Sequence, residues 1–358
     1  MPENVPENVT VAKRIISVVG CHAEGEQGDV ITGGVLPPAG DTMMSKKLAF
    51  ERDHDDIRRM LICEPRGSVA RHVNLIVPST RDDCAAGAIV MEPTEYPPMS
   101  GSNTMCIATV LLETGVIPMV EPQTRFRLDM PAGPIDIVAE CSAGKCVSVT
   151  LKNVPAFAFA LDAVLELAGH GPIDIDIAYG GMIYAIVDAA ALGFEIVPDE
   201  ARDLAELGER IRVAAREQHP VTHPELPDIK NVSIVQFAGP LTHDGNRVSA
   251  RNTCIVSPGR SDRSPTGTGT TARMAVLHAR GVLQVGGGLT HSSIIGSEFY
   301  GMIVGETSVG SLPAIEATIR GRAWITGLHH YFVDADDPWP SGYVLSDTWG
   351  MSTSVAQH

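Results

Sequence analysis

The stretch Asp262-Arg263-Ser264-Pro265-Thr266-Gly267-Thr268-Gly269-Thr270-Thr271 predicts a tight loop that leads into a helix. The run from Ala272 to Arg280 that follows has helical composition, and Gly281 is a suitable end for it. The free backbone N–H groups and the dipole at such a helix start attract an anion without any basic side chain. An ordinary capped helix carries the same pattern, so this stretch alone leaves both interpretations open.

A second stretch, Ser100-Gly101-Ser102-Asn103-Thr104, precedes another predicted helix that ends at Gly115. At a constant offset of 166 residues, the matched pairs are Ser100 with Thr266, Gly101 with Gly267, Ser102 with Thr268, and Gly115 with Gly281. Two hydroxyl-glycine-hydroxyl loops therefore start helices of equal length, which indicates an internal duplication. We expect the two helix starts to face each other across a cleft, with one hydroxyl on either side of a bound anion.

The composition of the chain argues against some classes of binding partner. The chain has 358 residues, of which 44% are hydrophobic, so it can form two domains with full cores. Its net charge of −16 argues against nucleic acid or an anionic membrane surface as a partner. No apolar run has membrane-spanning length, and the seven scattered cysteines, without a secretory leader, indicate reduced thiols in the cytoplasm.

The pattern of strands and helices repeats around the two loops. Ala88–Met91 and Cys254–Val256 are predicted strands, and each leads through a proline-containing turn into one of the loops. We also predict one helix from Ser45 to Leu61 and an amphipathic helix from Asp199 to Glu217. We assign residues 13–152 and 330–358 to the half that carries Ser100, and residues 153–329 to the half that carries Thr266.

The chemistry that the loops can support is narrow. Gly267-Thr268-Gly269 lacks the third glycine of a dinucleotide-binding loop, and the lysine of a phosphate-binding loop is missing. A site for a small anion remains, with Asp262 as a carboxylate that could bind an ammonium group. An amino acid carries both groups, and donors around its carboxylate stabilise the charge that develops when the α-proton leaves. His329-His330 has no third ligand at useful spacing, so no metal site is predicted.

Many short motifs resemble the proline racemase superfamily over nearly the whole chain, from about Ile16 to Trp349. The matching motifs are His22-x-Glu24-Gly25-Glu26, Thr32-Gly33-Gly34, Asp56–Met60, Glu64-Pro65-Arg66-Gly67, Ala178–Met182, Leu207–Ile211, Ser257-Pro258-Gly259-Arg260, Asp262-Arg263-Ser264-Pro265 and Gly267-Thr268-Gly269. The resemblance implies an α+β fold like that of diaminopimelate epimerase, with two pseudo-symmetric halves that each wrap a β-sheet around a central helix. It also implies an enzyme that needs neither pyridoxal phosphate nor a metal and is commonly a homodimer.

The departures from that resemblance concern the proton carriers. Racemases and epimerases of the family have a cysteine in each loop, where this chain has Ser100 and Thr266, and Ser102 replaces a histidine. A threonine at the second position is similar to the dehydratase pattern, in which one base suffices. An alcohol titrates far above neutral pH, so Ser100 would need activation, from the helix start or from a neighbour such as His22 or Asp262.

The first functional hypothesis is a lyase that dehydrates trans-3-hydroxy-L-proline, giving 1-pyrroline-2-carboxylate after tautomerisation. Ser100 would act as the base or its partner, Thr266 would contact the substrate or the leaving water, and Asp262 would bind the ring nitrogen. Backbone N–H groups of four residues would hold the carboxylate: Gly101, Ser102, Gly267 and Thr268. The alternatives are a 4-hydroxyproline epimerase or proline racemase that works with hydroxyls, and a hydroxyproline-binding protein without turnover.

Overall fold

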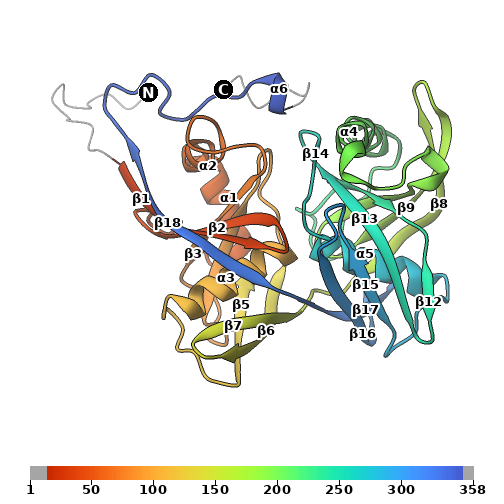
Figure 1. The fold of residues 1–358 in the computed structure, drawn as a ribbon, viewed down its shortest axis with the longest axis horizontal. Coiled ribbons are helices and arrows are strands. Elements are labelled where there is room, and N and C mark those ends of the chain that lie inside the picture. Colours follow the sequence, from red (N-terminus) through yellow and green to blue (C-terminus); the bar gives the residue numbers. More distant parts are fainter. Residues whose placement is uncertain (1–13, 350–358) are drawn as a thin grey trace.

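The computed structural model describes residues 14–349 as two similar halves. The first half contains β1 (Arg14–Ala23), β2 (Glu26–Gly33), α1 (Met43–Asp53), α2 (Asp55–Ile62), β3 (Arg71–Val77), β4 (Ala86–Met91), α3 (Gly101–Glu113), β5 (Gln123–Met130), β6 (Gly133–Ser142) and β7 (Lys145–Lys152). In Figure 1 this half surrounds α3 and the other half surrounds α5.

The second half begins at β8 and is followed by a strand that returns to the first half. Its elements are β8 (Phe157–Leu167), β9 (Gly171–Tyr179), β10 (Ile183–Asp188), two short 3₁₀ turns (Ala190–Leu192 and Pro198–Glu200), α4 (Ala201–Gln218), β11 (Ile234–Ala238), β12 (Thr242–Asp244), β13 (Arg247–Val256), β14 (Arg260–Ser261), α5 (Gly267–Ala279), β15 (Gly288–Ser292), β16 (Glu298–Val309) and β17 (Leu312–Gly321). The chain then continues through β18 (Ala323–Val333) and the short α6 (Ser346–Trp349).

Strand pairing repeats between the halves in the same order. In the first half, β2 pairs parallel with β3, β3 antiparallel with β4, β4 parallel with β5, and β5 antiparallel with β6. In the second half, β10 pairs parallel with β11, β11 antiparallel with β13, β13 parallel with β15, and β15 antiparallel with β16. The α+β fold with two pseudo-symmetric halves, expected from the duplicated loops and the family resemblance, is confirmed.

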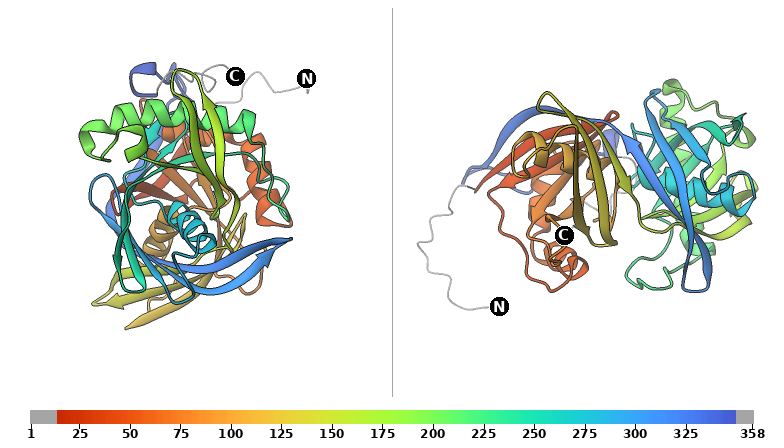
Figure 2. Two further views of the ribbon diagram at one scale, coloured as in Figure 1. Left: turned by 90° about the vertical axis from the view of Figure 1, so that its right-hand side faces the viewer. Right: turned by 90° about the horizontal axis from the view of Figure 1, so that it is seen from below.

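Each central helix is buried on almost all sides. All residues from Gly101 to Leu112 of α3 are buried, and α3 packs against β1, β2 and β7. The helix α5 packs against β8, β9, β16 and β17, and the left panel of Figure 2 shows it enclosed by strands. A helix that is buried all round needs no amphipathic stripe, so the small and apolar residues of both helices suit this position.

Two strand pairings join the halves. The strand β7 pairs antiparallel with β17, and β18 crosses back along the whole of β1, from Ala323 opposite Ala23 to Val333 opposite Arg14 (Figure 1). Pairing with the first half thus begins at Ala323, before the boundary placed at residue 330. The division into domains stays a prediction.

The helix predicted from Ser45 to Leu61 is wrong as one element. The structure has α1 and α2, separated at His54, whose φ of −137° and ψ of 23° leave the helical region. Thr42 caps α1 through a capping box with Ser45, and two aspartates start the first turn of α2. Each helix therefore carries its own start signal. The amphipathic helix predicted from Asp199 to Glu217 is confirmed as α4.

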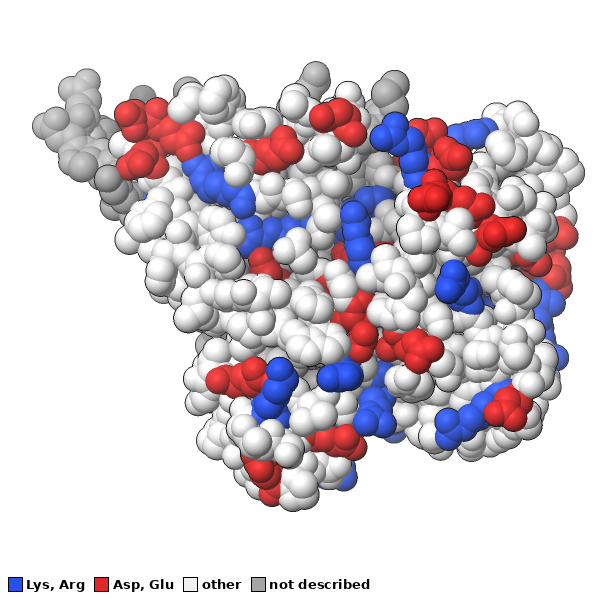
Figure 3. Space-filling model, in the orientation of Figure 1, with Lys and Arg blue, Asp and Glu red and all other residues white. Residues whose placement is uncertain are grey.

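Charged side chains of both signs are mixed on the face of the molecule that Figure 3 draws. On the face drawn in Figure 3, Lys and Arg side chains are interspersed with Asp and Glu and do not gather into one basic patch. Within residues 14–349, no helix is long and apolar enough to cross a membrane.

Candidate active site

The N-termini of α3 and α5 touch at two glycines. A Cβ atom added to Gly101 would lie 2.7 Å from the Cα of Gly267, and one added to Gly267 would lie 2.8 Å from the Cα of Gly101. Such distances leave no room for a side chain at either position. Since consecutive Cα atoms are about 3.8 Å apart, the Cα atoms of Ser100 and Thr266 lie within about 12 Å of each other.

Ser100 is the N-cap residue of α3 and is only 8% exposed. Its backbone is extended and its side chain makes no capping hydrogen bond; instead its Oγ accepts a hydrogen bond of 2.9 Å from Asn103 Nδ2. A hydroxyl that accepts from an amide keeps its own hydrogen for a different acceptor. Ser100 is thus arranged to donate a proton or a hydrogen bond. The sequence-based candidates for its activation were His22 and Asp262, and the partner in the structure is Asn103.

Asn103 belongs to a buried polar array that sequence reasoning missed. Asn74 Nδ2 donates to Asn103 Oδ1 at 2.8 Å, and Asn103 Nδ2 lies 3.1 Å from Nδ1 of His72. Burial lowers the pKa of His72 to about 3, with a further contribution from the charge of Arg260, so this imidazole is neutral at pH 7. Two polar residues in the buried strand β3 were the available sequence signal.

Thr266 occupies the matched position at the start of α5 and has a different support. Its φ of 62° and ψ of 108° put a β-branched residue in the left-handed half of backbone space, which costs about 1–3 kcal/mol. Thr266 Oγ1 donates to Asp262 Oδ2 at 2.7 Å, and its backbone N–H donates to Ser264 Oγ at 3.1 Å. The N–H and hydroxyl of Ser264 both donate to Asp262 Oδ1. Asp262 therefore holds the loop in this conformation.

Asp262 is buried and titrates near neutral pH. Burial raises its pKa to about 7, the Glu26 charge acts in the same direction, and the Arg260 charge opposes both. A carboxylate with that pKa can take a proton from Thr266 and release it again under physiological conditions. The assignment of the substrate's ring nitrogen to Asp262 stays a prediction, although this carboxylate already accepts hydrogen bonds from its own loop.

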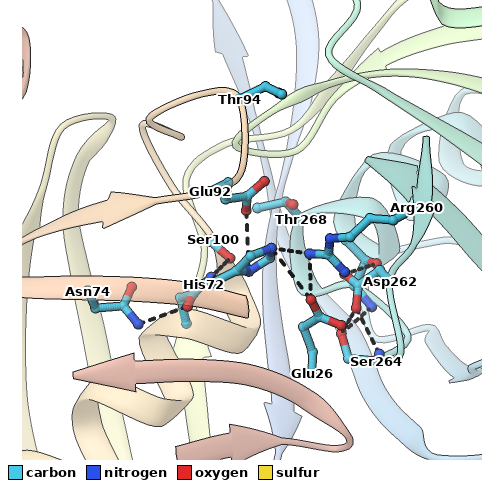
Figure 4. Close-up of polar contacts among 12 residues, drawn as sticks. Glu26, His72, Asn74, Glu92, Thr94, Ser100, Arg260, Asp262, Ser264 and Thr268 are labelled. Carbon is cyan, nitrogen blue, oxygen red and sulfur yellow. Dashed lines mark hydrogen bonds and ion pairs between the residues drawn. The ribbon is translucent and has the colours of Figure 1, made fainter. Parts of the chain in front are cut away.

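An ion pair connects the halves beside these loops. Glu26 of β2 lies 2.6 Å from Arg260 of β14, and the backbone N–H of Arg263 donates to Glu26 at 2.8 Å. His72 Nε2 also contacts Arg260, as Figure 4 shows. Burial alone would raise the pKa of Glu26, but the charge of Arg260 and the hydrogen bonds from Arg260 and the Arg263 N–H hold it below the usual range. The sequence contained Glu26 and Arg260 as motif residues but gave no reason to pair them.

The remaining predicted residues lie in the first turns of the two helices. Ser102 and Thr268 are buried, and the Thr268 hydroxyl lies 2.5 Å from the Tyr184 hydroxyl. The proposed carboxylate-binding role of the N–H groups of these two residues and of Gly101 and Gly267 stays a prediction. His22, in contrast, accepts a hydrogen bond from the Gly25 N–H and stacks on Trp324.

The overall fold is shared with proteins of much lower sequence identity. A Bacillus anthracis phenazine biosynthesis protein of the PhzF family aligns with 89% of this chain and 99% of its own, at a TM-score of 0.54 and 11% identity. That similarity concerns the fold alone. The profile of the proline racemase family matches residues 18–344, and the chain therefore belongs to this family.

Two crystal structures are much more similar. A hydroxyproline epimerase from Agrobacterium vitis, with bound trans-4-hydroxy-L-proline, is 39% identical, with a TM-score of 0.89 over 94% of this chain and 98% of that one. A probable proline racemase from Agrobacterium radiobacter, with bound carbonate, is 38% identical with the same TM-score and coverage.

Proposed function

We propose that this protein is a cofactor-independent epimerase that inverts the α-carbon of 4-hydroxyproline. The contact of the α3 and α5 N-termini at Gly101 and Gly267 supports this proposal, because it keeps the Cα atoms of Ser100 and Thr266, one from each half, within about 12 Å of each other. The 39% identity with a hydroxyproline epimerase whose structure holds trans-4-hydroxy-L-proline supports the choice of reaction and substrate. The dehydration of trans-3-hydroxy-L-proline becomes the second candidate.

The substrate carboxylate would bind between the two helix starts. The first N–H groups of an α-helix have no partner within the helix, and both helix dipoles favour an anion here. Removal of the α-proton moves negative charge onto the carboxylate oxygens. Donors that are already oriented at that position stabilise the charge as it develops, which is where such a site lowers the barrier most.

Thr266 and Ser100 would carry the two proton transfers. As Thr266 Oγ1 takes the α-proton, its own hydrogen passes along the 2.7 Å hydrogen bond to Asp262. Ser100 then donates its hydroxyl hydrogen to the opposite face of the α-carbon, and its oxygen keeps the hydrogen bond from Asn103. After product release, Asp262 loses the proton and Ser100 regains one through water, which restores the starting state. The reverse reaction uses the same steps in the opposite order.

The second candidate, dehydration of trans-3-hydroxy-L-proline, is favoured by one specific observation. Thr266 has a carboxylate partner, whereas the side chain that contacts Ser100 Oγ is the neutral amide of Asn103. Elimination needs one base for the α-proton and a departing 3-hydroxyl group, so unequal surroundings of the two hydroxyls suit it. In that reaction Asp262 receives the α-proton through Thr266, and the 3-hydroxyl leaves as water after protonation by Ser100.

Incubation in deuterated water separates the candidates. The purified protein is mixed separately with trans-4-hydroxy-L-proline, trans-3-hydroxy-L-proline and L-proline, and products are followed by proton NMR and chiral chromatography. Deuterium at the α-carbon of the inverted 4-hydroxyproline supports the epimerase. Formation of 1-pyrroline-2-carboxylate from the 3-hydroxy compound supports the dehydratase. Saturable binding without exchange on any compound would leave a binding protein and reject both reactions.

A further inference from the structure

Two amide side chains in the first half form a chain of hydrogen bonds that ends at Ser100. Asn74 Nδ2 donates to the backbone carbonyl of Asp29 at 3.1 Å and to Asn103 Oδ1 at 2.8 Å. Asn103 Nδ2 then donates to Ser100 Oγ at 2.9 Å. Both amides are buried, so water does not compete for these contacts. The proton transfers described above use Ser100 and give no role to Asn74.

A backbone carbonyl sets the direction of the whole chain. The Asp29 carbonyl oxygen can only accept a hydrogen bond, so the Asn74 atom that faces it is Nδ2 and not Oδ1. Because Nδ2 can only donate, the Asn103 atom beside it is Oδ1, and the Asn103 atom beside Ser100 is therefore Nδ2. The orientation of both amides thus follows from one fixed acceptor.

The surroundings of the two amides favour this orientation over a stable but unspecific packing. A Cβ atom added to Gly28 in β2 would lie 2.6 Å from Asn103 Oδ1, so a side chain at this position would displace that oxygen. Asn74 Oδ1 is buried and accepts no hydrogen bond from any residue in the range 14–349. A buried acceptor without a partner costs free energy, so stability alone gives no reason for an amide at Asn74.

The second half is built differently at the matched position. At the offset of 166 residues, Gly269 takes the place of Asn103, and a Cβ atom there would lie 2.9 Å from Nε2 of Gln236. Gln236 is fully buried and comes from β11, which corresponds to β3 in the order of strand pairing. The hydroxyl of Thr266 donates to a carboxylate. An amide that donates to the loop hydroxyl therefore distinguishes the first half.

We propose that Asn74 is a positioning residue that makes Ser100 a proton donor, by fixing the polarity of the Asn103 amide. This assignment rests on the proposed function. In the direction that starts from the L-isomer, Ser100 gives its hydroxyl hydrogen to the α-carbon, and the N–H of Asn103 stabilises the negative oxygen that remains. With the amide reversed, Asn103 Oδ1 would hold that hydrogen in a hydrogen bond, and Ser100 could not give it to the substrate.

Two substitutions of similar shape separate polarity from packing. In Asn74→Asp the buried carboxyl group stays protonated, and its one hydroxyl hydrogen goes to the Asp29 carbonyl. The same oxygen can then only accept from Asn103, so Asn103 Oδ1 turns to Ser100 and the chain is reversed. Asn74→Leu removes the anchor of the Asn103 amide without reversing it.

The readout is the fate of the α-hydrogen of trans-4-hydroxy-L-proline in deuterated water. Abstraction on the Thr266 face precedes both inversion and return to the L-isomer, whereas only inversion needs a proton from Ser100. We expect the ratio of deuterium exchange in the recovered L-isomer to inversion to rise at least about tenfold in Asn74→Asp, the effect of one hydrogen bond on a barrier. It should rise by a smaller factor in Asn74→Leu. A purely structural role would lower exchange and inversion together and leave the ratio unchanged.

The matched control is Gln236→Leu, which removes an equally buried amide from the corresponding strand of the other half. Its ratio should stay within about twofold of the wild-type value, because it acts away from the Ser100 side. An unchanged ratio in Asn74→Asp, or an equal rise in Gln236→Leu, would overturn the role of Asn74 and leave the proposed function in place. Wild-type protein that neither exchanges nor inverts the substrate rejects both. If Asn74→Asp does not fold, the ratio in Asn74→Leu, compared with Gln236→Leu, decides in the same way.

Discussion

The loops that start α3 and α5 have matched positions in the fold but different side-chain supports. Ser100 has an extended backbone and contacts an amide, whereas Thr266 has a positive φ and contacts a carboxylate. The two backbones approach each other almost symmetrically. A Cβ atom added to either glycine would lie at almost the same distance from the Cα atom of the other. The two halves thus share the backbone frame that we propose to hold a carboxylate, while the side chains that support it differ.

That difference separates binding from proton transfer. The helix N–H groups depend on backbone geometry, which the two halves share, and they suit a carboxylate in either orientation. Proton transfer depends on a titratable partner, and Asp262 supplies one to Thr266. We therefore expect substitutions in the shared backbone frame, at Gly101 or Gly267, to impair proton transfer on both faces of the substrate. Substitutions in the side-chain supports, such as Asp262 beside Thr266, should impair proton transfer on one face.

The largest combined effect, on turnover and on stability together, is expected from a methyl group at the contact of the two helices. Gly101→Ala places a Cβ atom 2.7 Å from the Cα of Gly267, and backbone atoms cannot yield to it as a flexible side chain could. The helix starts must move apart, so substrate turnover should fall by at least about a hundredfold, and the free energy of unfolding should drop by about 1–3 kcal/mol. Gly267→Ala should behave alike, as measured by turnover and by denaturant unfolding.

A matched control for this change lies in β2. A Cβ atom at Gly33 would meet the nearest atom, Cβ of Ser17, at 3.7 Å, which is an ordinary contact. Gly33→Ala should therefore retain wild-type turnover. If Gly101→Ala were as active as Gly33→Ala, the helix starts could not be the site of the reaction.

The sequence predicts the backbone frame of the two loops better than it predicts the side chains that support them. The duplicated loops predict two halves and two central helices, because the motif spacing and glycine positions are local properties of the chain. The supports depend on strands that approach only in the folded protein: His72 and Asn74 come from β3, and Glu26 and Arg260 come from opposite halves. No spacing in the sequence indicates which of the buried polar residues meet.

The prediction of one helix across Ser45–Leu61 is wrong for the opposite reason. Local start signals for two helices are present in the sequence, but the longer apolar pattern favours a single helix. The start signals at Thr42 and at Asp55-Asp56 separate two helices, although the apolar positions continue across His54. The expected homodimer and cytoplasmic location stay predictions.

Removal of the Asp262 charge should have the next largest effect. Asp262→Asn keeps the shape of the side chain but cannot take the proton of Thr266, so kcat should fall by about 10²–10⁴, the usual contribution of a general base. The corresponding change in the first loop, Asn103→Leu, removes a neutral donor to Ser100 and should lower kcat by about tenfold. Steady-state kinetics of both variants measure the contrast. Equal losses in the two would mean that the loops contribute alike and that Asp262 has no special role.

The pH dependence of kcat should report Asp262. Its pKa is raised to about 7, and only the carboxylate can accept a proton, so kcat should rise about tenfold per unit up to pH 7 and then level off. The same shift has a stability counterpart of opposite sign. Since the folded-state pKa lies above the usual value of 3.8, the contribution of Asp262 to stability is full below pH 4 and is lost as the pH rises through 7.

The variant Asp262→Asn serves as the reference for both pH measurements. It should flatten the kcat profile and remove this fall in the free energy of unfolding between about pH 4 and 7. A kcat profile of the wild-type protein that stays level from pH 5 to 8 would contradict the proposed role of Asp262.

The smallest effect is expected at Tyr184, whose hydroxyl contacts the Thr268 side chain at the start of α5. The Tyr184 and Thr268 hydroxyls lie 2.5 Å apart, and Thr268 sits in the first turn of α5, where its backbone N–H is the group proposed to bind the carboxylate. Tyr184→Phe removes one buried hydrogen bond and should lower the free energy of unfolding by about 1 kcal/mol, with a change in KM of at most about threefold. Because the backbone of α5 is held by its own helix hydrogen bonds and by Gly101, the N–H group should keep its position. A tenfold rise in KM would instead mean that the Thr268 side chain, and not the shared backbone frame, contacts the substrate.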